Sequence, residues 1–111
     1  MPKIKPILDE WGVILEAQRK LPDERHRLQF LEALAELQNN DSYVQRQFPK
    51  TRLHRLSGVD QAVYRADVDK ISGWRIHVQL LDGKLHLKDL VPGEEHDRAA
   101  GAVKTRKVRY S

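Results

Sequence analysis

Cysteine is absent from this sequence, and so are long hydrophobic runs. Without cysteine the chain cannot form disulfides or thiolate metal sites, and this composition fits a reducing compartment, so we expect a cytoplasmic protein. A transmembrane helix needs about 20 apolar residues, far more than any apolar run here, so we expect no membrane span. The N-terminal MPKIKPILDE contains lysines but no apolar stretch, and we expect no secretory signal. No segment repeats, and 111 residues suit a single domain over 1–111 with one modest core.

Positive charge is distributed unevenly along the chain. The formal net charge is +4, yet residues 1–45 sum to −2 (six basic, eight acidic) and residues 56–97 sum to −3 (five basic, eight acidic). The excess lies in RQFPKTRLHR (46–55), with four cations and no acid, and in RAAGAVKTRKVRYS (98–111), with five cations and no acid. Clustered cations beside a weakly acidic remainder indicate a surface for a polyanion. A solvated loop and a frayed basic tail are the alternative, because basic runs are common on protein surfaces.

Two helices are predicted in the N-terminal part of the chain. Apolar residues recur at helical spacing over 8–21, where Gly12 weakens the pattern, and over 21–40, where the pattern is stronger. Pro22 separates the two runs, so we expect a helical hairpin rather than one long helix.

Alternating apolar and polar residues predict short strands elsewhere. A strand over 3–8 would lie at a sheet edge because it contains Pro6. The Asp82-Gly83 dipeptide predicts a two-residue hairpin turn between two of the later strands. The later strand candidates cover residues 52–56, 61–69, 73–81 and 84–91, and the tail over 94–110 is more typical of a helix.

The two helices require an apolar surface to cover, and one face of a sheet offers it. We therefore predict an α+β fold in which two N-terminal helices pack on one face of a small twisted antiparallel sheet, followed by a basic C-terminal segment. The two-residue turn pairs Gln79 with His86 and His77 with Lys88. The opposite face is expected to be open to solvent and flanked by the basic segments 46–55 and 98–111. Its polar side chains would be Arg65, Arg75, His77, Gln79, His86 and Lys88.

Such a face could hold a phosphate backbone through arginine and lysine. In single-stranded RNA a base can remove the proton of a 2′-hydroxyl, which then attacks the adjacent phosphodiester, and histidine suits this role without a metal. An ordinary solvated sheet face carries the same residue types, so that interpretation stays open. A metal site on His77 and His86, with Asp67 or His96, is a weaker alternative because no ligand motif is present and the nearby cations would repel the ion. We therefore expect no metal and no cofactor.

Five short motifs follow the helical segments in order: LHRLSG (53–58), VYRADV (63–68), SGWRIHV (72–78), DGKLHLKDL (82–90) and PGEEHDRA (92–99). Their order resembles the RelE/ParE superfamily of bacterial toxin–antitoxin toxins, over about residues 3–98. The resemblance implies a compact α+β fold with helices packed on an antiparallel sheet. It also implies one of two activities, since RelE-like members cleave mRNA in the ribosomal A site without a metal and ParE-like members inhibit DNA gyrase.

The resemblance suggests roles for individual residues. Arg65 matches a basic residue on the central strand, and Arg75 matches the arginine that contacts the scissile phosphate. His96 lies near where several relatives place a histidine or basic residue for acid–base work. We assign phosphate contact to Arg65 and Arg75. We assign proton transfer to His96 or His77. Asp67 departs from the pattern, because RelE-type toxins carry a second strand lysine there. Attraction of the RNA is assigned to a larger set: Lys50, Arg52, His86, Lys88, Lys104, Arg106, Lys107, Arg109 and Tyr110.

The expected function is that of a bacterial toxin that inhibits translation as a ribosome-dependent mRNA endoribonuclease. Its expected partners are a separate antitoxin chain, the ribosome and mRNA, with no small-molecule cofactor. A ParE-like inhibitor of gyrase and a non-catalytic RNA-binding module of the same fold are the alternatives.

Overall fold

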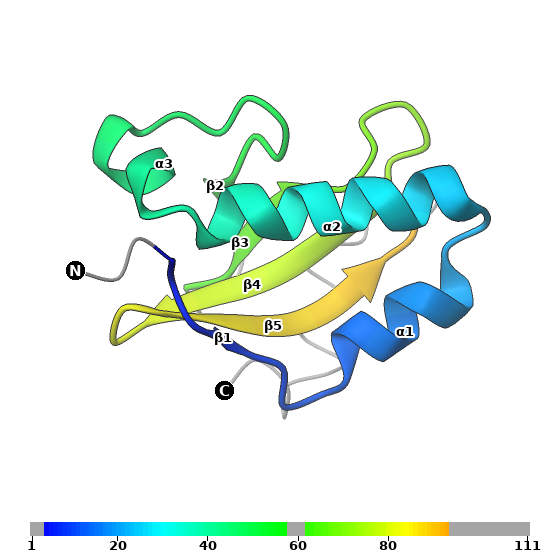
Figure 1. The fold of residues 1–111 in the computed structure, drawn as a ribbon, viewed down its shortest axis with the longest axis horizontal. Helices are drawn as coiled ribbons and strands as arrows, with labels where there is room; N and C mark the ends of the chain where they lie inside the picture. The colour runs from blue at the N-terminus through cyan, green and yellow to red at the C-terminus, as the bar shows by residue number, and fades with distance from the viewer. Residues whose placement is uncertain (1–3, 58–61, 94–111) are drawn as a thin grey trace.

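The computed structural model describes residues 4–57 and 62–93 of the chain. Figure 1 shows α1 and α2 lying together over one face of a sheet, with α3 beyond the C-terminal end of α2. This arrangement confirms the predicted α+β class and the helical hairpin. The elements in chain order are β1 (Ile7–Leu8), α1 (Val13–Lys20), α2 (Glu24–Gln38), α3 (Asn40–Gln45), β2 (His54–Arg55), β3 (Tyr64–Asp67), β4 (Arg75–Leu81) and β5 (Lys84–Val91).

The five strands form one sheet in the order β1-β5-β4-β3-β2. Strands β2 to β5 pair antiparallel, but β1 runs parallel to β5, so the prediction of a purely antiparallel sheet is wrong at this edge. Strands β1 and β5 are far apart in the chain, so no hairpin turn joins them and imposes an antiparallel pairing. Pro6 suits the edge because its carbonyl accepts a hydrogen bond from the Leu85 N–H (2.8 Å), while the missing N–H of proline is not needed there.

Helix α1 is shorter than the predicted segment 8–21 because Gly12 precedes it in the left-handed region, with φ of 68°. The Asp9 carboxylate caps the helix start by accepting hydrogen bonds from the N–H groups of Val13 (2.7 Å) and Ile14 (3.0 Å). Gly12 therefore lies directly before the helix and not within it, so it does not weaken the helix interior.

Helix α2 begins where the Asp23 carboxylate accepts a hydrogen bond from the His26 N–H (2.9 Å). It ends at Gln38, and the Asn39 side chain then caps α3 by accepting from the Asp41 N–H (3.0 Å). The sequence did not predict α3, because this short helix buries no residue and so has no apolar periodicity. Within residues 4–57 and 62–93, no helix has the length and hydrophobicity that a membrane crossing would require.

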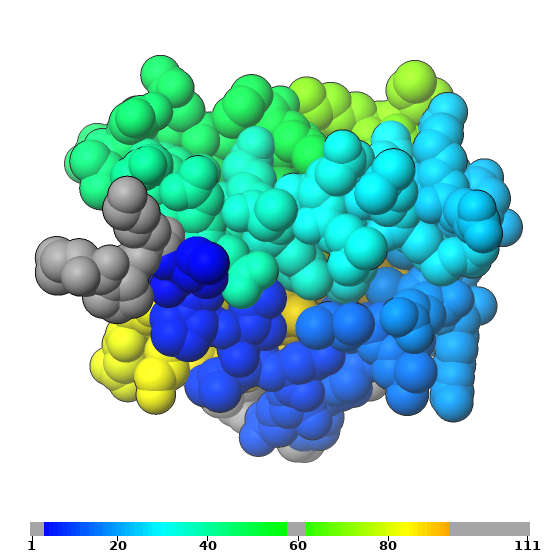
Figure 2. All heavy atoms as spheres, viewed as in Figure 1, coloured from blue at the N-terminus to red at the C-terminus, as the bar shows by residue number. Residues whose placement is uncertain are grey.

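The hydrophobic core lies between the two long helices and the sheet. Figure 2 shows in space-filling form how the side chains of α1 and α2 close over this side of the molecule. Complete burial of one valine, leucine or isoleucine side chain contributes roughly 1.5–3 kcal/mol to stability. The core includes Val13, Ala17, Phe30, Leu34 and Leu37 from the helices and Ile76, Val78, Leu85 and Leu87 from the sheet.

The turn between β4 and β5 has the predicted two residues. Asp82 and Gly83 both have positive φ, 53° and 73°, as a type I′ turn requires. Next to it the predicted pair of Gln79 with His86 is confirmed.

The predicted pair of His77 with Lys88 is wrong. A register shift between His77 and Val78 inserts one extra residue in β5, and Asp89 becomes the partner of His77. This bulge explains two consecutive polar residues, Lys88 and Asp89, because it changes which side chains of β5 share a face. Leu90 consequently joins the hydrophobic core.

Two glycines allow the loop before β4 to pack closely against the end of β5. A Cβ atom built on Gly93 would lie 1.8 Å from the Ser72 carbonyl oxygen, and one on Gly73 would lie 2.8 Å from the Gly93 Cα. The backbones are therefore in contact where the sequence reads SGW and PG, and only glycine fits this packing.

Candidate nucleic-acid interface

Cross-strand pairing arranges the polar side chains in rows on the sheet face opposite the helices. In one row His54 of β2 pairs with Arg65 of β3, Arg65 with His77 of β4, and His77 with Asp89 of β5. Directly opposed residues of adjacent strands project to the same side of a sheet. The row therefore runs from the β2 edge into the centre of the face, with cationic or titratable groups at each position.

A neighbouring row centres on the Asp67 carboxylate. Asp67 pairs with Arg75, whose Nε lies 3.6 Å from Asp67 Oδ1. Arg52, which precedes β2, donates from its Nε to Asp67 Oδ2 at 2.6 Å. One buried carboxylate thus holds two guanidinium groups, and this explains how an acid can occupy a face rich in cations.

The expectation that this face is open to solvent is wrong for its inner part. The exposed fractions are 7% for Arg75, 0% for His77, 6% for Gln79 and 6% for Lys88. Alternation along a strand predicts which side chains share a face, but it does not predict whether that face is solvated. All four residues take part in polar or ring interactions.

Burial changes the chemistry of the inner residues. Loss of solvent, followed by repulsion from Arg65 and Arg75, lowers the pKa of His77 from 6.5 to about 4. The imidazole is therefore neutral at physiological pH and cannot donate a proton there. The pKa of Arg75 is also lowered, first by burial and then by Arg65, while Asp67 opposes the shift.

The outer end of the face is different because it reaches solvent. Arg52 and His54 are exposed, and Arg65 is half-buried. We refer to Arg52, His54 and Arg65 as the β2-edge cluster. The Arg52 side chain is 55% exposed even though its Nε is bound to Asp67, so the guanidinium can still meet a ligand from solvent.

Helix α2 positions Arg52 through the turn that precedes it. The Glu36 carboxylate accepts three hydrogen bonds, from the Lys50 N–H (2.9 Å), the Thr51 N–H (2.9 Å) and the Thr51 hydroxyl (2.6 Å). Arg52 follows in the left-handed region with φ of 48°, and its N–H donates to the Phe48 carbonyl (2.8 Å). An unusual backbone conformation is thus held by a half-buried carboxylate of the helical layer.

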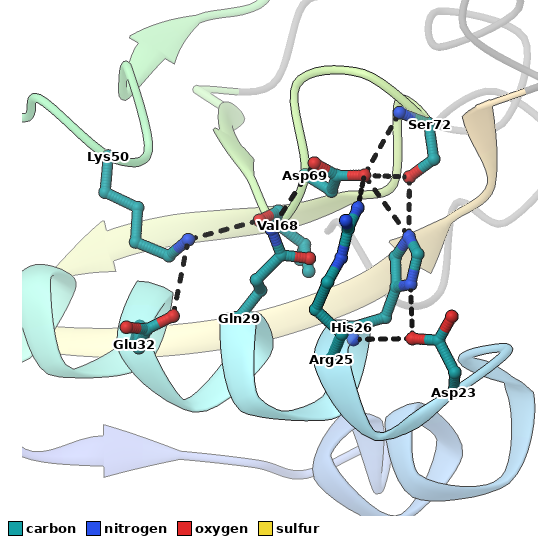
Figure 3. A network of polar contacts seen from close by, with 9 residues as sticks. All are labelled: Asp23, Arg25, His26, Gln29, Glu32, Lys50, Val68, Asp69 and Ser72. Carbon is teal, nitrogen blue, oxygen red and sulfur yellow. Dashed lines mark hydrogen bonds and ion pairs between the residues drawn. The ribbon is translucent and has the colours of Figure 1, made fainter.

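The basic segment 46–55 does not act as one surface. The Lys50 ammonium lies 3.9 Å from the Glu32 carboxylate of α2 and donates to the Val68 carbonyl (3.4 Å), as Figure 3 shows. Lys50 therefore faces α2, whereas Arg52 reaches the polar face of the sheet.

The remaining predicted site residues divide into two groups. His86 is half-buried on β5 opposite Gln79. His96, Lys104, Arg106, Lys107, Arg109 and Tyr110 lie outside the described residues.

Sequence reasoning assigned no role to His54. Its signal was available in RLHRL (52–56), where alternation would place His54 on the same side as Arg52, but a two-residue strand gives too short a pattern to fix its partner. The pairing of His54 with Arg65 supplies that information.

A second polar cluster joins α2 to the loop after β3 (Figure 3). His26 Nδ1 lies 2.7 Å from Asp23 Oδ1, and its Nε2 lies 2.9 Å from the Ser72 hydroxyl. These distances resemble a hydrolytic triad, but the Ser72 hydroxyl donates its proton to Asp69 at 2.6 Å. His26 is thus not placed to remove that proton. The hydrogen bonds from Ser72 lower the pKa of Asp69 from 3.8 to about 2, which indicates a structural link.

No group of three or more potential metal ligands is present in the part of the chain that the structure describes. Comparison with family models, with curated proteins and with solved structures finds no match to this chain.

Proposed function

We propose that this protein binds single-stranded RNA at the β2-edge cluster and acts as a RelE-like toxin that cleaves mRNA on the ribosome. The observation that carries the proposal is the pairing of Arg52 and Arg75 with one carboxylate, that of Asp67, with Arg65 two residues away on the same face of β3. These three guanidinium groups and the Asp67 carboxylate together carry a net charge of +2, and Arg52 and Arg65 are the members of this group that reach solvent.

Guanidinium groups suit this ligand because they contact phosphate oxygens in a planar, bidentate geometry. The exposed position of Arg52 and the half-buried position of Arg65 allow a phosphate to approach from the β2 side. Arg75 lies deeper and is bound to Asp67. Its role in the proposal is to contribute positive potential and to hold that carboxylate in place.

The coarse architecture supports the same proposal. An α+β fold with a helical hairpin on one sheet face agrees with what the family resemblance implies. A toxin of this kind would work in the bacterial cytoplasm under the control of a separate antitoxin chain.

A second candidate function is RNA binding without cleavage. His77 favours it, because a buried imidazole with a pKa of about 4 is a poor proton-transfer group at neutral pH. The two candidates share the β2-edge cluster and differ only in whether the bound strand is cut.

Cell-free translation with mapping of mRNA 5′ ends tests the proposal. Wild-type protein should arrest translation and produce new ends within ribosome-bound mRNA. The double variant Arg52→Gln/Arg65→Gln should lose at least tenfold in activity. Arg55→Gln is the matched control, because Arg55 is also exposed on β2 but pairs with Tyr64, one position out of phase with His54.

Each alternative has its own outcome in this experiment. RNA that is bound with a steep salt dependence yet stays intact supports the binding module. Inhibition of purified gyrase with intact mRNA supports the ParE-like alternative. A wild-type protein that neither binds RNA nor arrests translation contradicts the proposal.

A further inference from the structure

His54 occupies the solvent-exposed end of the row that continues through Arg65 and His77. Its Nδ1 lies 2.8 Å from the Arg52 carbonyl oxygen. A carbonyl oxygen can only accept a hydrogen bond, so in the neutral ring Nδ1 carries the proton and Nε2 carries the free electron pair. The contact thus fixes both the orientation of the imidazole and the atom that can take up a proton.

Three arginines are neighbours of His54. Arg65 faces it from β3, Arg52 lies two residues earlier on the same side, and Arg55 is the next residue along β2. The Asp67 carboxylate lies one pair further along β3 and is bound to Arg52. A phosphate held between Arg65 and the exposed part of the Arg52 guanidinium would therefore lie beside the imidazole, while the Arg52 Nε stays bound to Asp67.

We infer that His54 is the general base of RNA cleavage, and this inference rests on the proposed function. Nε2 of His54 removes the proton of the ribose 2′-hydroxyl, and the 2′-oxygen forms a bond to the adjacent phosphorus. The bond from phosphorus to the 5′-oxygen breaks, and the leaving 5′-oxygen takes a proton from water. The imidazolium then releases its proton to solvent, so the products are a 2′,3′-cyclic phosphate and a 5′-hydroxyl end.

Of the two histidines in the row, His54 suits the role of general base better than His77. His77 is close to the arginines but buried, whereas His54 has the same arginine neighbour and meets solvent. An exposed base can reach a substrate strand without rearrangement of the sheet. Arg65, which lies between the two histidines, would contact the scissile phosphate.

The test compares binding and cleavage in one variant. His54→Gln keeps a polar side chain of similar reach but has no basic nitrogen, and at an exposed position it should leave the fold intact. Cleavage should fall by about 100-fold or more, whereas RNA affinity should fall far less than in Arg52→Gln/Arg65→Gln, which loses two phosphate contacts. The pH profile of the cleavage rate should differ between the wild type and the variant, because only the wild type has the basic nitrogen.

Two controls separate the inference from the proposed function. His54→Ala should regain part of its activity when free imidazole is added, and a strand with 2′-deoxyribose at the scissile position should bind but stay intact. Cleavage by His54→Gln within threefold of wild type, with an unchanged pH profile, overturns the role of His54 and leaves the proposed function standing. Absence of cleavage by the wild type overturns both.

Discussion

Replacement of His77 by glutamine should make the stability of the protein less sensitive to mild acid. In the folded chain this side chain is fully buried, and its pKa is lowered from 6.5 to about 4 by loss of solvent and by Arg65 and Arg75. Between these two values the unfolded chain binds a proton at His77 and the folded chain does not. Stability from this group is therefore complete above the unfolded pKa and decreases as the pH falls.

The magnitude follows from the two pKa values. A shift of one unit corresponds to about 1.4 kcal/mol, so the full effect is about 3 kcal/mol below the folded pKa. From about pH 7.5 to about pH 5 the loss should be roughly 2 kcal/mol, because the folded protein still excludes the proton over most of that range.

Urea denaturation at these two pH values measures the effect. The useful quantity is the loss of unfolding free energy in the wild type minus the loss in His77→Gln, because carboxylates and the other histidines contribute to both and cancel. A difference near 2 kcal/mol in the expected direction supports the buried, neutral state of His77. Equal losses in the two proteins would refute it.

Three further perturbations test the framework around the site. Glu36→Ala removes the acceptor of three hydrogen bonds to the turn before β2, so urea denaturation should show a loss of about 2–3 kcal/mol and RNA affinity should fall with it. Intact affinity would show that this turn does not position Arg52. Asp69→Asn should cost roughly 1–2 kcal/mol near neutral pH and little near pH 2, because the lowered pKa of Asp69 adds stability that is present above its unfolded pKa and lost as the pH falls toward about 2. The same cost at both pH values would contradict the assigned charge. Gly93→Ala should lower the melting temperature more than Gly83→Ala, whose cost is about 1 kcal/mol. Of these two positions, only Gly93 would place a Cβ against backbone atoms. The reverse order would show that the loop contact is dispensable.

Local chemistry made the central hairpin predictable from sequence. The Asp82-Gly83 dipeptide allows positive φ at both positions, and it fixed the register of the nearest pairs. The prediction failed beyond the bulge, because a register shift depends on packing across the sheet. The consecutive polar residues Lys88 and Asp89 were the visible sign that simple alternation ends there.

The sequence predicted which residues make up the candidate site, but it did not predict how deeply each side chain is buried. Alternation placed Arg65, Arg75 and His77 on one face, and the structure confirms that they share it. Their burial differs, because solvent access depends on what surrounds the whole face and not on the period of one strand. The role proposed for His54 was not predictable either, because it depends on the pairing with Arg65, eleven residues later in the chain.

Residues in the inner part of the polar face are more buried than those at its β2 edge, which suggests that the two groups have different roles. Inner groups such as Arg75 and Asp67 form a fixed charged layer, and their mutual contacts reduce the cost of desolvation. Outer groups such as Arg52 and His54 keep the access that a polymeric ligand needs. Substitutions in the inner layer should therefore change stability first, and substitutions in the outer layer should change RNA binding or cleavage first.

The salt dependence of RNA binding tests the central claim most directly. The affinity of wild type, Arg52→Gln/Arg65→Gln and Arg55→Gln for a short single-stranded RNA should be measured at several salt concentrations by fluorescence anisotropy. Each lost phosphate contact should reduce the slope of log affinity against log salt by about 0.7 for a single strand, so the double variant should lose about 1.4 and Arg55→Gln almost nothing. Identical slopes for the wild type and the double variant would contradict the assignment of the β2 edge as the RNA-binding surface.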